Sequence, residues 1–195
     1  MDPRIEDIRA AVARDGDNRA FAQKGWRPLF VADGQARLLV VGHAPGASAQ
    51  ESGVAWGDKS GQNLMDWLGL DEKDFRDPGK VALIPMDFYY QGKGASGDLP
   101  PRKGFAGKWH PALLSLLPEL RLRVLAGGYA QGHYLAGRAK RNLTETVRAY
   151  REYLPDFFPI PHPSPLNFRW QGRNPWFLSE AVPELRARVR DALDG

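Results

Sequence analysis

The chain has 195 residues, 43% of them hydrophobic, and contains no cysteine. This length predicts one domain with a hydrophobic core, and the lack of cysteine excludes disulfides, iron–sulfur clusters and thiol catalysis. The formal net charge is +4, and basic residues gather in the second half, which favours a phosphate-bearing partner. No apolar run is long enough to span a membrane, and the charged N-terminus is unlike a signal peptide, so we expect a cytoplasmic protein.

Hydrophobic periodicity predicts alternating helices and strands. Amphipathic helices are expected over residues 3–23, within an N-terminal helical extension (residues 1–35) packed on the domain. Short β-type runs lie at 36–41, 81–84, 121–126 and 157–160. Further helices are expected at 62–70, 105–117, 129–136, 142–152 and 174–193, the last interrupted by Pro183. We therefore predict a single domain over residues 1–195 with a three-layer α/β/α fold and a central, mostly parallel four-stranded sheet.

Three loops follow predicted strands and are expected to meet at one edge of the sheet. The first runs over residues 43–61. The second, residues 86–104, is long for a structureless loop and carries an aromatic triplet at 88–90, which favours a functional role. The third, residues 161–170, is stiffened by three prolines in five residues, which exclude a helix. Open α/β sheets bind ligands at this edge.

Motifs in these loops resemble those of the uracil-DNA glycosylase superfamily. Gly-His-Ala-Pro-Gly at residues 42–46 follows the first strand of the sheet, and His-Pro-Ser-Pro-Leu at 162–166 follows the fourth. Residues 53–61, Gly-Val-Ala-Trp-Gly-Asp-Lys-Ser-Gly, are similar to a stretch of the thermophile-type branches. The resemblance covers residues 36–190. It implies a monofunctional DNA glycosylase that flips uracil, or another deaminated base, out of DNA and hydrolyses its N-glycosidic bond.

The resemblance also implies roles for individual residues. Asp58 would orient water or stabilise the sugar cation, with His43 as the other candidate, and His162 would donate a hydrogen bond to the leaving base. Trp56 would stack on the flipped base, and Leu166 would fill the gap left in the duplex. Further contacts are expected with the base, at Phe88, Asp87, Asn63 and Ala44, and with DNA, at Pro45, Gly46, Ser164, Pro165, Asn167 and Arg169.

Two positions depart from the superfamily pattern. Ala44 stands where the best-known branch has its water-activating aspartate, and Asp87 or Asn63 would have to replace the asparagine that reads uracil. Asp58 has a structural alternative, as the cap of the next helix, although Ser60 could fill that role. A catalytically inactive DNA-binding member of the same fold therefore stays open. So does an enzyme that cleaves the same bond in a free nucleoside.

The expected partner is uracil-containing DNA, single- or double-stranded, bound by a monomer. We expect no membrane association and no cofactor. We expect no metal site, because the four histidines show no ligand spacing and no cysteine is present.

Overall fold

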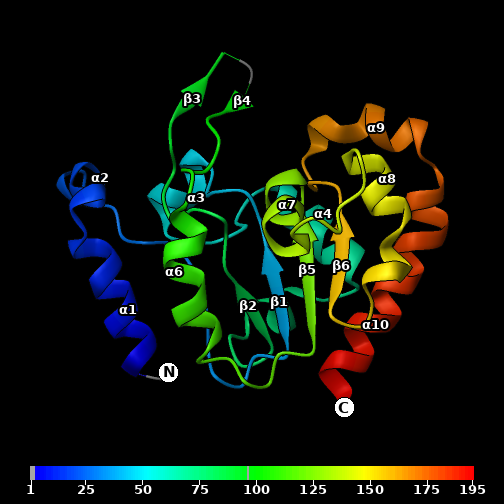
Figure 1. Ribbon diagram of the computed structural model, residues 1–195, viewed down its shortest axis with the longest axis horizontal. Coiled ribbons are helices and arrows are strands. Elements are labelled where there is room, and N and C mark those ends of the chain that lie inside the picture. The colour runs from blue at the N-terminus through cyan, green and yellow to red at the C-terminus, as the bar shows by residue number, and fades with distance from the viewer. Residues whose placement is uncertain (1–2, 96) are drawn as a thin grey trace.

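A sheet of four parallel strands forms the centre of the computed structural model, which describes residues 3–95 and 97–195. The strand order is β2-β1-β5-β6, and all neighbouring pairs are parallel. The strands are β1 (Leu38–Val41), β2 (Val81–Leu83), β5 (Leu122–Ala126) and β6 (Phe157–Ile160). Helices flank the sheet (Figure 1). The predicted α/β fold with its four-stranded parallel sheet is confirmed.

The sheet separates two hydrophobic cores. Alternate residues of β1 enter each core, because successive side chains of a strand point to opposite faces. One core includes side chains of α4 (Lys59–Leu68) and α10 (Val182–Asp194). The other includes side chains of α1 (Pro3–Arg14), α6 (Phe105–Leu114) and α7 (Gly128–Leu135). The helices therefore fix the sheet from both faces and leave its carboxyl edge to the loops.

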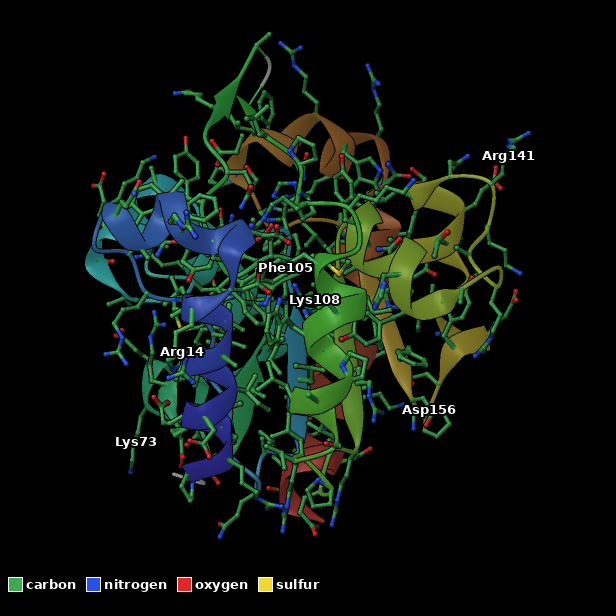
Figure 2. The ribbon with its side chains drawn as sticks, turned by 60° about the vertical axis from the view of Figure 1, so that its left-hand side comes forward. Arg14, Lys73, Phe105, Lys108, Arg141 and Asp156 are labelled. Atoms are coloured by element: carbon green, nitrogen blue, oxygen red, sulfur yellow. The ribbon has the colours of Figure 1, made fainter. Side chains whose placement is uncertain are left out.

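The N-terminal residues form α1, a 3-10 turn (Gly16–Asn18) and α2 (Arg19–Gln23). Helix α1 runs along α6, on which Figure 2 labels Phe105 and Lys108. Arg9 of α1 donates hydrogen bonds to the main-chain oxygens of Pro28, at 2.7 Å, and Phe30, at 3.1 Å.

None of the described helices is long and apolar enough to cross a membrane.

The helix that follows the first loop begins earlier than predicted. Helix α4 starts at Lys59, and Asp58 is its N-cap, because its Oδ1 accepts the Gly61 amide at 3.1 Å. The structural alternative for Asp58, as the cap of this helix, is therefore confirmed, and Ser60 does not take that role. Three further helices of the described residues were not predicted: α3 (Ala47–Ser52), inside the first loop, α5 (Glu72–Arg76), which Asp71 caps, and α9 (Phe168–Arg173), which begins inside the predicted third loop.

The C-terminal elements are shorter and more divided than the apolar spacing predicts. The stiff third loop ends in a 3-10 turn, η3 (Pro165–Asn167), and passes directly into α9 (Phe168–Arg173). A π-helical turn (Phe177–Ala181) precedes α10, and Pro183 lies in the first turn of α10, where a proline is tolerated. The predicted helix at 142–152 divides into α8 (Leu143–Arg148) and a 3-10 turn, η2 (Tyr150–Tyr153).

The second loop is not structureless. It contains an antiparallel hairpin of β3 (Lys93–Gly94) and β4 (Gly97–Asp98), which projects at the top of Figure 1. Its aromatic triplet also differs from the prediction, because Phe88 and Tyr89 are both 0% exposed and belong to the second core. The functional reading of Phe88 is therefore corrected to a packing role.

Candidate active site

A cavity of about 640 Å³ lies where the loops after β1, β5 and β6 meet. The start of α4, the β3–β4 hairpin and α9 complete its walls. This is the edge at which parallel sheets bind ligands. The lining side chains that can bind or react with a ligand are His43, Trp56, Asp58, Ser60, Lys93, Asp98, Tyr129, His162, Ser164 and Asn167.

The His162 ring is held in one tautomer. Its Nδ1 accepts the Ser164 amide at 3.2 Å, so the proton of the neutral ring is on Nε2. Burial lowers the pKa of His162 to about 4; the charge of His43 lowers it further, and that of Asp58 raises it. At neutral pH the ring is therefore uncharged, and Nε2–H is its hydrogen-bond donor.

Two asparagines hold the His162 loop in place. Asn167 Nδ2 donates to the His162 carbonyl at 2.7 Å, and Asn63 Nδ2 donates to the Pro163 carbonyl at 2.9 Å. Asn63 does not line the cavity, so its predicted contact with the base is replaced by a role in fixing this loop. Leu166 lines the mouth of the cavity and is 82% exposed.

Trp56 forms another part of the cavity wall. Its ring centroid lies 5.5 Å from that of His162, with the two planes inclined by 31°. A flat aromatic side chain beside a ring donor is a suitable surface for a planar base. Its backbone has a φ of 55°, in the left-handed region that residues other than glycine rarely adopt.

His43 and Asp58 line the same cavity. Burial lowers the pKa of His43, while the charges of Asp98 and Asp87 raise it. The His43 ring meets that of Tyr129 edge-on at 5.2 Å. Asp58 uses Oδ1 to cap α4, and within the described residues Oδ2 has no hydrogen-bond partner. The structure thus brings the three predicted catalytic residues to one cavity, together with Ala44, Pro45 and Gly46.

Asp87 does not line this cavity, and its carboxylate is fully paired. It is 0% exposed, and Arg102 donates to it through the side-chain Nε at 2.8 Å, Nη2 at 2.9 Å and the amide at 3.1 Å. The Tyr89 amide donates a fourth bond at 3.2 Å. A carboxylate offers about four acceptor sites, so none is left for a base. The prediction that Asp87 reads the base was wrong, because Arg102, near the other end of the same loop, donates hydrogen bonds to both of its carboxylate oxygens.

A second buried histidine supports the floor of the cavity. His110 Nε2 donates to the Pro85 carbonyl at 3.0 Å, and Nδ1 accepts the Tyr134 hydroxyl at 2.7 Å. The Phe88 ring lies parallel to that of His110, at 5.7 Å. Burial lowers the pKa of His110 to about 4. Because Pro85 lines the cavity, this network fixes its position.

Four charged or aromatic side chains of the described cavity lining were not singled out from the sequence. Lys93 and Asp98 face each other across the hairpin. They lie in the loop whose unusual length had indicated a functional role. Tyr129, 53% exposed, opens α7 after the glycine pair at 127–128, which was a sequence signal for a turn at a strand end. Trp170 lies on α9 and donates to Thr144 Oγ1 at 2.9 Å. Nothing in the spacing of Trp170 distinguishes it from a core residue.

Comparison with known proteins identifies one family. The model of the uracil DNA glycosylase superfamily matches residues 28–186, which include all four strands and every loop of the cavity. Among solved structures, the chain is similar to the solution NMR structure of a candidate uracil DNA glycosylase from Methanosarcina acetivorans, with 16% sequence identity and a TM-score of 0.48. That alignment covers 84% of this chain and 94% of the other.

Proposed function

Because the chain belongs to the uracil DNA glycosylase superfamily, we propose that it excises uracil, or another deaminated base, from DNA by hydrolysis of the N-glycosidic bond. The observation that carries this proposal is the cavity of about 640 Å³ that holds a neutral His162 beside His43 and Asp58. Such a reaction would initiate base-excision repair.

His162 stabilises the leaving base in this proposal. When the bond between the base and C1′ breaks, both electrons stay with uracil, and negative charge develops on its carbonyl oxygens. The Nε2–H of His162 donates a hydrogen bond to the O2 of that anion, and no proton needs to leave the ring. A donor placed where charge develops contributes about 3–4 kcal/mol of transition-state stabilisation.

Asp58 and His43 act on the sugar side. The free Oδ2 of Asp58 stabilises the positive charge on the sugar and orients a water molecule toward C1′. His43 stays neutral because burial lowers its pKa, so a ring nitrogen is available to accept the proton of that water. Asp58 and His43 are alternative candidates for activating this water. Excision by the variants Asp58→Asn and His43→Gln distinguishes between them.

The remaining residues bind the DNA. Trp56 stacks on the flipped base, and Leu166 enters the duplex where the base has left. Backbone amides and side chains around the mouth then contact the phosphates or sugars, at Pro45, Gly46, Ser164, Pro165, Asn167 and Arg169.

An excision assay tests the proposal. Oligonucleotides that carry uracil, hypoxanthine or xanthine, in single- and double-stranded form, are incubated with excess protein, and abasic product is measured. We expect excision of at least one base, and a reduction of about 10²- to 10³-fold in the His162→Ala variant. No product from any of these bases at high protein concentration would contradict the proposal.

A DNA-binding protein without excision is the second candidate function, and one observation favours it. Among the described cavity-lining residues the only carboxamide is Asn167, which already donates to the His162 carbonyl. Asp87 is fully paired with Arg102, so no side chain at the end of β2 reads the base edge. Salt-sensitive DNA binding with no base release, unchanged by Asp58→Asn, would select this candidate.

A further inference from the structure

Trp56 is held in its unusual backbone conformation by three neighbours. The first is Arg76, at the end of α5, whose guanidinium donates from Nη1 to the Ala55 carbonyl and from Nη2 to the Trp56 carbonyl at 3.1 Å. Arg76 does not line the cavity. Because its planar fork binds two successive carbonyls, it fixes the direction of both peptide planes around Trp56.

Two glycines shape the space around the same residue. A Cβ atom on Gly42 would lie 2.6 Å from Cζ2 of the Trp56 indole, so the ring rests directly on the end of β1. A Cβ atom on Gly61 would lie 1.8 Å from the Trp56 carbonyl oxygen, so the first turn of α4 closes on the peptide from the other side. No other side chain fits at either glycine without displacing Trp56.

We infer that Arg76 is a positioning residue that presents the Trp56 indole to the base. This inference rests on the proposed function, in which Trp56 stacks on the flipped base. The left-handed backbone of Trp56 is intrinsically unfavourable, so without the guanidinium the segment relaxes and the indole leaves its place beside His162. Because the indole is already fixed before DNA binds, the affinity for DNA is not lowered by the entropy cost of ordering this side chain.

The anchoring of Arg76 supports a fixed rather than a mobile clamp. The preceding residue, Phe75, is 0% exposed and belongs to the core between the sheet and α10. The Arg76 guanidinium lies 5.3 Å from the Phe75 ring centre, and Glu72 lies 3.8 Å from its Nε. A helix of five residues thus connects the core to the cavity wall.

The first test measures excision in a double-mutant cycle. Single-turnover excision of the preferred base is compared in the wild type, Arg76→Ala, Trp56→Phe and the double variant, with binding of undamaged DNA as the second readout. We expect Arg76→Ala to slow excision about tenfold, a size consistent with the partial loss of one base–aromatic stack, and to change binding of undamaged DNA less than about twofold. In the Trp56→Phe background the same change should slow excision by clearly less than in the wild type, because the two residues act as one unit.

Arg186→Ala is the matched control. Arg186 also donates two bonds to the main chain, but to the carbonyl of Asp66, which does not line the cavity, whereas Ala55 and Trp56 do. Its removal should lower stability without slowing excision. Arg76→Lys, which keeps the charge but not the fork, should fall between Arg76→Ala and the wild type. Equal effects of Arg76→Ala in both Trp56 backgrounds, or no effect on excision, would overturn the inference.

A second test does not depend on activity. The protein has six tryptophans, and labelling with 5-fluorotryptophan gives each a 19F resonance; that of Trp56 is the one missing in Trp56→Phe. In Arg76→Ala we expect this resonance to shift or broaden while the others stay in place. An unchanged Trp56 resonance refutes the positioning role. A wild-type protein that excises no base refutes the proposed function alone, because the 19F result still stands.

Discussion

The loop after β6 and the first part of the loop after β2, residues 86–90, begin at the same edge of the sheet but use their polar residues in opposite ways. After β6, His162 and Ser164 line the cavity. After β2, Asp87 and the aromatic residues Phe88 and Tyr89 are each 0% exposed. In both loops, a polar residue that follows a parallel strand is therefore a candidate functional residue. Its hydrogen-bond partners decide whether it lines the cavity or is buried.

The difference lies in where each loop obtains its hydrogen bonds. In the loop after β6, the carbonyls of His162 and Pro163 accept hydrogen bonds from the side chains of Asn167 and Asn63. The prolines of this loop have no backbone N–H that would need an acceptor. The His162 ring accepts one local amide and keeps its second nitrogen for a ligand. In the loop after β2, by contrast, Arg102 and the Tyr89 amide together occupy both carboxylate oxygens of Asp87. The internal bonds of the loop after β6 use only one nitrogen of the His162 ring, so the other nitrogen is available to a ligand. The bonds to Asp87 use both of its oxygens.

Among the substitutions, removal of Asp87 should have the largest effect on stability. Asp87→Ala leaves the Arg102 guanidinium without its buried partner, and breaking such a pair costs about 3–5 kcal/mol. Since Arg102 is 26% exposed, water offsets part of this, and we expect about 3 kcal/mol. Urea unfolding measures the loss, and excision per folded molecule should stay within about twofold of the wild type, in line with the limited effect of changes outside a site.

Arg102→Ala and Asp87→Asn complete this comparison. Arg102→Ala should destabilise to a similar extent, because it leaves the carboxylate buried and unpaired. If Asp87→Asn instead kept full stability and changed which base is excised, Asp87 would be a base reader after all. The contrast between the two loops would then be wrong.

The sequence predicts what is local and misses what depends on distant partners. The parallel sheet follows from four apolar runs separated by helices, and the cavity-lining position of His162 follows from prolines around a strand end. Asp87 could not be resolved in the same way, because Arg102 lies fifteen residues later and nothing in its spacing marks it as a partner. The role of Phe88 depends equally on packing against His110, which is remote in sequence.

Asp58 shows why capping and catalysis are hard to separate in a sequence. An aspartate three residues before a glycine at the start of a helix fits an N-cap, and the structure shows that cap. The carboxylate has two oxygens, however; the cap uses only Oδ1, and the residue lines the cavity. Both interpretations of the sequence describe the same side chain, and only the geometry shows that they are compatible.

Acid should weaken both regions, through His162 in one and His110 in the other. Burial lowers the pKa of each to about 4 in the folded protein, below the ordinary value of 6.5. As pH falls below about 6.5 the unfolded chain takes up protons that the folded chain does not, so stability that is fully present above 6.5 is lost down to about 4. At ~1.4 kcal/mol per pKa unit, each histidine accounts for a loss of order 3 kcal/mol.

Urea unfolding at pH 7.5 and pH 4.5 measures this loss. Carboxylates add their own pH dependence, so the variant His110→Asn is the comparison. It should be less stable than the wild type at pH 7.5 but should lose less stability on acidification. An equal loss in both proteins would show that the pKa of His110 is not lowered in the folded state.

The smallest predicted effect concerns Leu166 and depends on the form of the DNA. At 82% exposure the side chain contributes little to folding, so Leu166→Ala should change stability by less than about 0.5 kcal/mol. A wedge matters only where a flipped base leaves a gap in a stack, and we expect excision from double-stranded DNA to fall about tenfold more than excision from single strands. The ratio of the two single-turnover rates measures this. Leu178→Ala, exposed by 46% and absent from the cavity wall, should leave the ratio unchanged. A ratio unaffected by Leu166→Ala would mean that the loop after β6 presents His162 without entering the duplex.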